Sequence, residues 1–227
     1  YIKDIGTPAR LVRAEAALRS GEVAAKSYRT PQHAVFIYRD GVINREVDGV
    51  LCPKDLEVLQ GVAAAIGALN RSPFLVIVAT NQPLIAKGFA SAAEVDAVHA
   101  ALDQTLANEG AYLDDLMMCP HHPERGHKGE VEKLKVVCQC RKPQPGMLLE
   151  AAARHNIDLE RSFMIGDRES DWKAAVAAGV TPILVARDQV RSADPRVTHT
   201  SLADAVAHIL SLPQVDKTSE TVLKINA

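Results

Sequence analysis

The chain has 227 residues, of which 47% are hydrophobic and 24% are charged, and its formal net charge is −2. This length accommodates one α/β domain with an extension, and the near-neutral charge argues against a nucleic-acid or membrane-surface protein. No apolar run approaches the ~20 residues that span a bilayer, and the opening residues show no signal-peptide pattern. We therefore expect a cytoplasmic protein that binds neither nucleic acid nor membrane.

We expect three parts along the chain: an N-terminal extension over residues 1–30, one domain over 31–212 and a polar tail over 213–227. Within the extension, residues 11–21 have the composition of a short helix that ends at Gly21.

The first residues of the extension resemble the end of sugar-phosphate nucleotidyltransferase domains, which often close with a similar run followed by a helix. The shared run is Tyr-Ile-Lys-Asp-Ile-Gly-Thr-Pro over residues 1–8, and the resemblance extends to about residue 20. It implies that a nucleotidyltransferase domain is fused to this chain or associated with it. A plain N-terminal extension is the alternative.

Apolar runs of strand length alternate with helical patterns along the expected domain. We expect strands at residues 35–37, 74–79, 162–165 and 182–186, and helices at residues 60–70, 91–107, 147–155, 172–178 and 202–210. The run from Phe74 to Ala79 is apolar throughout, which is typical of a strand buried on both faces. This alternation predicts an α/β fold, a Rossmann-like parallel sheet with helices on both faces.

Four side chains suited to phosphate chemistry lie in the loops that leave these runs: Asp40, Thr80, Lys142 and Asp167. Because ligands of open α/β sheets collect beyond the carboxyl ends of the strands, we expect these side chains to share one site. A hydroxyl and an ammonium group can donate to phosphoryl oxygens, and carboxylates are ligands that Mg²⁺ prefers. The sequence therefore predicts a phosphate site that uses Mg²⁺.

These four residues, in this order, resemble the four motifs of the haloacid dehalogenase (HAD) phosphatases, and the resemblance covers about residues 33–187. The run Arg-Asp-Gly-Val-Ile-Asn over residues 39–44 most resembles the branch that acts on heptose 1,7-bisphosphate, with the related histidinol-phosphatases as the alternative. The resemblance implies the HAD fold with a minimal cap, and Mg²⁺-dependent release of phosphate from a small phosphorylated sugar.

The resemblance also implies a role for each residue in a two-step phosphoryl transfer through an acyl-phosphate. Asp40 would act as general acid and base, and its backbone carbonyl would ligate Mg²⁺ together with Asp167. Thr80 would hold the phosphoryl group, and Lys142 would pair with the nucleophile and the phosphate and stabilise the phosphoryl charge. The residues that would line the substrate pocket are Asn44, Asn81, Gln82 and Arg141. For the two asparagines and the glutamine, local turn chemistry is the alternative.

Tyr38 stands where the resembled family has its nucleophilic aspartate. A phenol has a pKa of ~10, so at neutral pH it is neither an anion nor a good Mg²⁺ ligand. A second departure lies close by, because this chain has Pro83 and Leu84 where the family usually has Ser-Gly. Two hypotheses follow: a phosphatase that Tyr38 inactivates or impairs, or a catalytically silent domain that binds a sugar phosphate or supports a nucleotidyltransferase.

A polar segment over residues 119–146 contains three of the four cysteines. Cys119 and His121 form a Cys-x-His pair, and Cys138 and Cys140 form a Cys-x-Cys pair. Three thiolates and one imidazole make up a closed, tetrahedral Zn²⁺ site, which would be structural. His121 fits the position of the histidine ligand in the resembled family, and His122 and His127 are the alternatives. The same pattern marks the heptose-bisphosphate branch of the resembled family.

Overall fold

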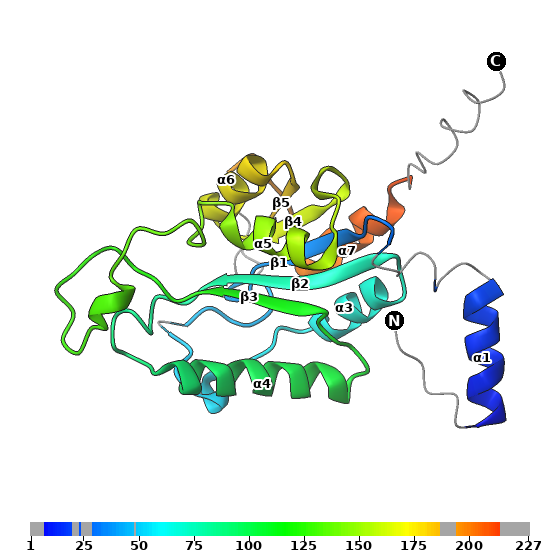
Figure 1. Cartoon of the computed structure of the whole chain (residues 1–227), viewed down its shortest axis with the longest axis horizontal. Helices are drawn as coiled ribbons and strands as arrows, with labels where there is room; N and C mark the ends of the chain where they lie inside the picture. The colour runs from blue at the N-terminus through cyan, green and yellow to red at the C-terminus, as the bar shows by residue number, and fades with distance from the viewer. Residues whose placement is uncertain (1–6, 20–22, 24–28, 48, 187–193, 214–227) are drawn as a thin grey trace, which may run out of the picture.

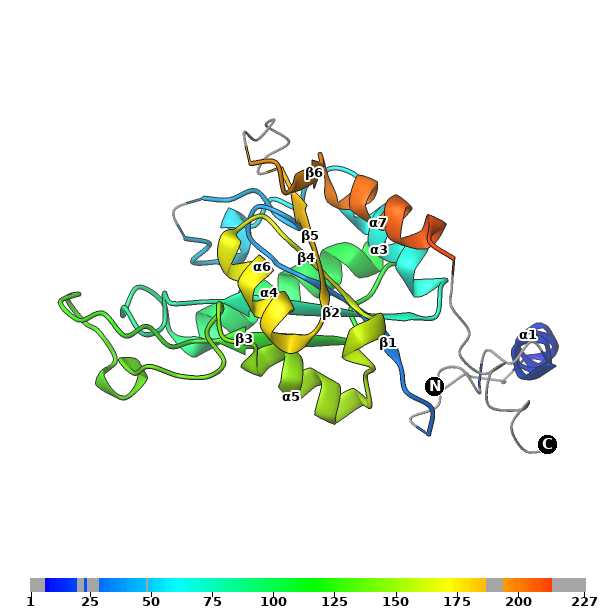
Figure 2. The same cartoon turned by 90° about the horizontal axis from the view of Figure 1, so that it is seen from above.

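The computed structural model describes residues 7–19, 23, 29–47, 49–186 and 194–213. The start of the nucleotidyltransferase-like run, much of the expected extension and nearly all of the polar tail lie outside these residues. Helix α1 (Pro8–Arg19) belongs to the extension and lies away from the sheet in both Figure 1 and Figure 2. The division into an extension, a domain and a tail stays a prediction.

Within the described residues, six strands form one sheet in which every neighbouring pair is parallel. The strands are β1 (His33–Ile37), β2 (Phe74–Asn81), β3 (Asp115–Cys119), β4 (Phe163–Gly166), β5 (Thr181–Val185) and β6 (Val197–His199). Their order across the sheet is β3-β2-β1-β4-β5-β6. The direction of strand addition reverses between β1 and β4, and this is where open α/β sheets bind their ligands.

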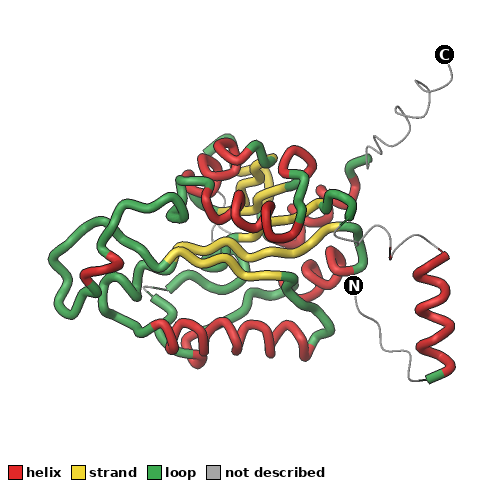
Figure 3. Tube along the Cα trace, viewed as in Figure 1, coloured by secondary structure: helices red, strands yellow, loops and turns green. Residues whose placement is uncertain are grey.

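Helices cover both faces of the sheet (Figures 1 and 3). They are α3 (Val62–Asn70), α4 (Ala92–Asn108), α5 (Gly146–His155), α6 (Glu169–Ala178) and α7 (Leu202–Ser211). Helices α3 and α7 pack against each other on the face that α4 also covers, while α5 and α6 pack together on the opposite face. In the described part of the chain, none of the helices has the length and hydropathy needed to cross a bilayer.

Three short 3-10 helices lie in the connections: η1 (Pro53–Asp55), η2 (Glu132–Leu134) and η3 (Leu159–Arg161). The segment between β1 and α3 holds η1, in keeping with the predicted minimal cap. Helix α4 begins at a reciprocal cap, in which Ser91 Oγ accepts from the Glu94 N–H (3.2 Å) and Glu94 Oε2 accepts from the Ser91 N–H (2.7 Å).

The central strands explain the continuous apolar runs of the sequence. Val35, Phe36 and Ile37 of β1 are completely buried, because β1 is paired on both edges and covered on both faces. The predicted parallel α/β sheet is confirmed, and the predicted helices and strands are found within a few residues of their bounds. Two edge strands, β3 and β6, were not predicted.

Candidate active site

The carboxyl ends of β1, β2 and β4 border one pocket with a volume of about 290 Å³. Six of the predicted site residues line it: Tyr38, Asp40, Asn81, Gln82, Arg141 and Lys142. Three further predicted residues contact this lining: Asn44 contacts Asp40, Thr80 contacts Gln82, and Asp167 pairs with Arg168. The fold thus brings predicted residues from separate segments to one edge of the sheet.

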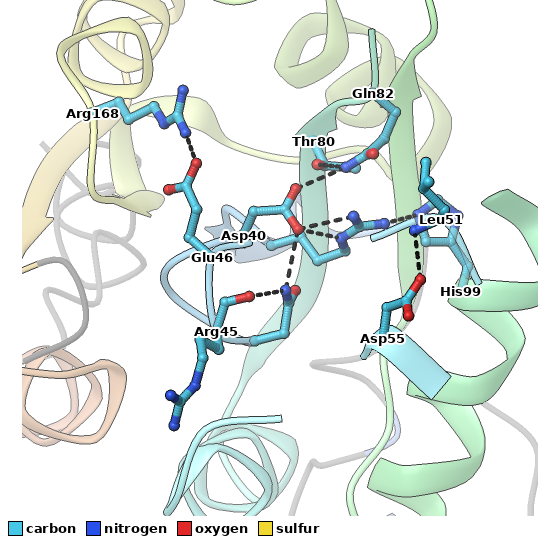
Figure 4. A network of polar contacts seen from close by, with 11 residues as sticks. Asp40, Arg45, Glu46, Leu51, Asp55, Thr80, Gln82, His99 and Arg168 are labelled. Atoms are coloured by element: carbon cyan, nitrogen blue, oxygen red, sulfur yellow. Dashed lines mark hydrogen bonds and ion pairs between the residues drawn. The ribbon is translucent and has the colours of Figure 1, made fainter. Parts of the chain in front are cut away.

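Asp40 lies at the centre of a hydrogen-bond network (Figure 4). Its Oδ1 accepts from Arg39 Nε (3.0 Å), Arg39 Nη2 (2.8 Å) and Asn44 Nδ2 (3.2 Å). Its Oδ2 accepts from Gln82 Nε2 (2.9 Å), which also donates to Thr80 Oγ1 (2.9 Å). Both carboxylate oxygens of Asp40 are therefore held in place, and the Thr80 hydroxyl keeps its own hydrogen for a further acceptor.

Arg39 is 1% exposed and connects the network to helix α4. Its Nη1 lies 3.0 Å from His99 Nε2. Because a guanidinium can only donate, His99 accepts this bond through Nε2 and is neutral. Burial, and then the charge of Arg39, lower the pKa of His99 to about 4.

This lowered pKa predicts a loss of stability at acidic pH. The unfolded chain binds a proton at His99 near pH 6.5, whereas the folded chain does so only near pH 4. As the pH falls from 6.5 to 4, the free energy of unfolding should therefore decrease by about 3 kcal/mol from this group. Urea unfolding across this range should show a smaller decrease in His99→Gln, whose amide oxygen can still accept from Arg39. Equal decreases in parent and variant would assign the effect to other groups.

Carboxylates also gather around the residue that follows Asp40. Gly41 has a φ of +85°, and a Cβ there would lie 2.6 Å from Asp167 Oδ2 and 3.4 Å from Glu46 Oε2. Only glycine lets these side chains approach so closely. The side chain of Asp167 is completely buried. Hard oxygen donors in this arrangement fit a cation such as Mg²⁺, which Asp40 and Asp167 would hold.

Lys142 is buried, and its Nζ binds two partners deep in the site. It pairs with Asp171 Oδ1 (2.6 Å) and donates to the Ala79 carbonyl oxygen (2.6 Å). Asp171 can approach because residue 166 is glycine, where a Cβ would lie 2.3 Å from that of Asp171. Burial lowers the pKa of Lys142, and the charge of Asp171 opposes this effect.

Asn81 holds the backbone of Lys142 from β2. Its Oδ1 accepts from the Lys142 N–H (3.0 Å), and its Nδ2 donates to the Lys142 carbonyl oxygen (3.1 Å). Asn81 was predicted to contact the substrate, and it does line the pocket. Its amide is bonded at both ends to the Lys142 backbone, so Asn81 also positions Lys142, and its contact with substrate stays a prediction.

Tyr38 fills the position between the site's cations. The Lys142 Nζ lies 3.9 Å from the centre of the Tyr38 ring, and the Arg168 guanidinium carbon lies 5.8 Å from it. Arg168 also pairs with Glu46 (Figure 4). Burial, and then the charge of Asp40, raise the pKa of the Tyr38 phenol well above its ordinary value. The phenol is therefore neutral at physiological pH.

The four predicted zinc ligands come together beside this pocket. Cys119 ends β3 and is in register with Asn81. Its Sγ lies 3.1 Å from Cys140 Sγ and 3.6 Å from both Cys138 Sγ and His121 Nδ1. The sulfur separations exceed the ~2.05 Å of a disulfide. Zn²⁺ with bonds of ~2.0–2.3 Å would hold tetrahedral ligands ~3.5–3.8 Å apart, close to this arrangement. The group fits Zn²⁺, as predicted.

Several residues of the site were not predicted from the sequence: Arg39, Glu46, Lys87, His99 and Arg168. Arg39 and Arg168 each adjoin a predicted acid, and that adjacency was the available signal. His99 lies 60 residues from Arg39 in the chain. No local pattern links the two, because only the packing of α4 brings them together.

This chain is similar in sequence and structure to known proteins. A family model described as HAD-hydrolase-like matches residues 139–210. The D-glycero-beta-D-manno-heptose-1,7-bisphosphate 7-phosphatase of Rhodopseudomonas palustris is 41% identical over 158 residues, which cover 70% of this chain and 84% of that protein. The Escherichia coli K12 protein of the same name is 41% identical over 153 residues, which cover 67% and 78%.

A solved structure of a protein with a similar name also resembles this chain. The D,D-heptose 1,7-bisphosphate phosphatase from B. bronchiseptica, complexed with magnesium and phosphate, is 32% identical to this chain. The two superpose with a TM-score of 0.67 over 79% of this chain and 98% of the other. The similarity therefore extends over both sequence and fold.

Proposed function

Because this chain belongs to the family of the D-glycero-beta-D-manno-heptose-1,7-bisphosphate 7-phosphatases, within the HAD phosphatases, we propose that its pocket binds a phosphorylated sugar of the heptose 1,7-bisphosphate type. In this proposal the chain, as it stands, holds the sugar phosphate without hydrolysing it at a useful rate. The observation that carries the proposal is that Tyr38, which the resemblance assigns to the nucleophile's position, lines one pocket together with other predicted site residues.

The surrounding residues keep roles that suit phosphoryl chemistry. Asp40 and Asp167 would hold Mg²⁺, which when bound offsets the negative charge of the phosphoryl oxygens. Lys142 supplies a fixed positive charge at the carboxyl edge of the sheet, and the Thr80 hydroxyl can donate to a phosphoryl oxygen. Arg141 lines the pocket and offers further donors to the bound sugar phosphate.

In the described part of the pocket lining, the carboxylates are already engaged and are not placed to replace the missing nucleophile. Among the residues that the structure describes, Asp40 and Glu46 are the carboxylates that line the pocket. The oxygens of Asp40 accept bonds from three side chains, and Glu46 is paired with Arg168. A carboxylate held by such bonds is a weak nucleophile, because attack on phosphorus would require giving them up.

Two finer parts of the proposal rest on the sequence. A fused or associated nucleotidyltransferase is suggested by residues 1–8, of which residues 1–6 lie outside the described part of the chain. A cytoplasmic location is also proposed, because enzymes that act on phosphorylated sugars work in that compartment. Neither affects the chemistry of the pocket.

Binding of the sugar phosphate tests the proposal. Isothermal titration with Mg²⁺ and D-glycero-beta-D-manno-heptose 1,7-bisphosphate should give one site per chain, and Arg141→Ala should weaken it by about tenfold or more. The matched control is Arg154→Ala, which removes a half-exposed arginine on helix α5. Binding should be unchanged in this control. Absence of any binding to the unchanged chain would overturn the proposal and leave the domain as a scaffold.

A further inference from the structure

Tyr38 carries a phenol group whose hydrogen-bonding capacity is unused among the residues that the structure describes. Tyr38 lines the pocket and is 5% exposed, and its backbone N–H donates to the Ile165 carbonyl oxygen (2.9 Å). Within the described part of the chain, the phenol oxygen makes no hydrogen bond, and it is not sealed in the interior. The hydroxyl is therefore free to donate to a molecule in the pocket.

The ring of Tyr38 is held in place from one face. The Lys142 Nζ lies 3.9 Å from the ring centre, and this nitrogen is itself fixed by Asp171 Oδ1 (2.6 Å) and the Ala79 carbonyl oxygen (2.6 Å). This cation–π contact and the backbone bond to β4 restrict the side chain before any ligand arrives. A donor that is already ordered loses little conformational freedom on binding, which favours affinity.

Arg168 brings further unused donors to the pocket. Its guanidinium carbon lies 5.8 Å from the centre of the Tyr38 ring, and its Nη2 pairs with Glu46. Its Nε lies 3.9 Å from Asp167 Oδ1, beyond hydrogen-bond distance, and is buried without a hydrogen-bond partner among the described residues. A buried donor without a partner costs free energy, which a bond to an oxygen atom of a ligand would recover.

The neutral charge of the phenol also favours an unreacted phosphate. The resemblance places an aspartate at residue 38, and its carboxylate would share the pocket with Asp40. A second carboxylate there would repel a phosphate dianion, whereas a phenol, with an ordinary pKa of ~10, stays neutral and donates a charge-assisted hydrogen bond. Tyrosine therefore favours binding of the ground state at the expense of the reaction.

We propose that Tyr38 Oη and the Arg168 guanidinium together bind the phosphoryl group of the ligand, so that Tyr38 is a ligand-binding residue as well as the residue that silences the reaction. The inference rests on the proposed function, because it assumes that the pocket takes a phosphorylated sugar. The two residues follow β1 and β4, the neighbouring strands at which the direction of strand addition reverses. This is where open α/β sheets bind their ligands.

Isothermal titration with Mg²⁺ and D-glycero-beta-D-manno-heptose 1,7-bisphosphate tests the inference on the unchanged chain and three variants. Tyr38→Phe keeps the ring beside Lys142 and removes only the oxygen, so the dissociation constant should rise by about tenfold or more. Arg168→Lys keeps the charge but not the planar fork, and it should also raise the dissociation constant. Tyr112→Phe is the matched control, because Tyr112 is 48% exposed and lies outside the pocket lining, and binding should be unchanged.

The melting temperature without ligand separates a role in binding from a role in folding. Because the Tyr38 oxygen has no hydrogen-bond partner among the described residues, Tyr38→Phe should melt no lower than the unchanged chain. A clearly lower melting temperature would show that the hydroxyl serves the fold, and it would contradict the inference.

The remaining outcomes separate this inference from the proposed function. If the unchanged chain binds the sugar phosphate and either Tyr38→Phe or Arg168→Lys binds it as tightly, the assignment of the pair is wrong while the proposed function stands. If the unchanged chain does not bind it, the proposed function and the inference are overturned together. If Tyr112→Phe weakens binding as much as Tyr38→Phe, the loss is not specific to the pocket, and the assignment of Tyr38 is wrong.

Discussion

Replacing Tyr38 with aspartate should produce a chain that releases phosphate from heptose 1,7-bisphosphate at least about 10³-fold faster than the unchanged chain. The substitution supplies a carboxylate next to Lys142 and the other carboxylates of the site, where an acyl-phosphate could form. It also removes a ring that lies 3.9 Å from the Lys142 ammonium. The measurement is Mg²⁺-dependent phosphate release under multiple-turnover conditions.

The matched control is Tyr38→Asn, which opens the same space but carries an amide that cannot attack phosphorus. Activity in the aspartate variant and none in the asparagine variant would show that the missing carboxylate, and not the bulk of the ring, silences the site. If the aspartate variant were as inactive as the asparagine variant, the pocket would have changed beyond residue 38. Pro83 and Leu84, which both line the pocket, would then be the first residues to revert.

Removing the metal from the Cys-His group should be the change with the largest effect on stability. The free energy of binding Zn²⁺ at a structural site adds directly to the free energy of folding. Even a part of this binding free energy amounts to several kcal/mol. For a chain of this size, a loss of about 5 kcal/mol lowers the melting temperature by about 10–20 °C. Cys140→Ser should therefore lose zinc, measured by elemental analysis, and unfold at a clearly lower temperature in calorimetry.

Cys52→Ser provides the control for this experiment. Cys52 is the cysteine outside the group, and its thiol donates to Asp55 Oδ2 (3.0 Å), a bond that a serine hydroxyl can also make. This variant should keep both its zinc and its melting temperature. A chain that is purified without zinc and melts at the same temperature as the zinc-bound form would contradict a structural role for the metal.

The metal site and the pocket are coupled through short connections. Cys119 ends β3 in register with Asn81 of β2, and Asn81 holds both backbone groups of Lys142. Cys140 precedes Lys142 by two residues. Loss of zinc should therefore disturb the placement of Lys142 as well as the stability of the loop, so binding of a sugar phosphate should weaken in Cys140→Ser.

The sheet could be predicted because its central strands are apolar throughout, which follows from burial on both faces. The two strands that were missed lie at the edges of the sheet. β3 contains Met117 and Met118, which carry no strong strand preference, and β6 has only three residues. Their pairing depends on the neighbouring strand more than on their own composition.

The residue types of the site and the order of its motifs could be predicted from the sequence. The hydrogen bonds and ion pairs between its side chains could not. Lys142 was expected to meet the nucleophile and the phosphate, whereas its closest anionic partner is Asp171. The bond between Arg39 and His99 joins the end of β1 to helix α4. Such contacts depend on how separate elements pack, and a single sequence carries no local signal for them.

The central claim is that Tyr38 leaves this family member able to bind its sugar phosphate but unable to hydrolyse it. The most direct test is phosphate release from heptose 1,7-bisphosphate by the unchanged chain with Mg²⁺, measured beside Tyr38→Phe. We expect both proteins to release no more phosphate than buffer. Release by the unchanged chain alone would identify the phenol oxygen as the nucleophile, and release by both would place the nucleophile elsewhere; either result would contradict the account.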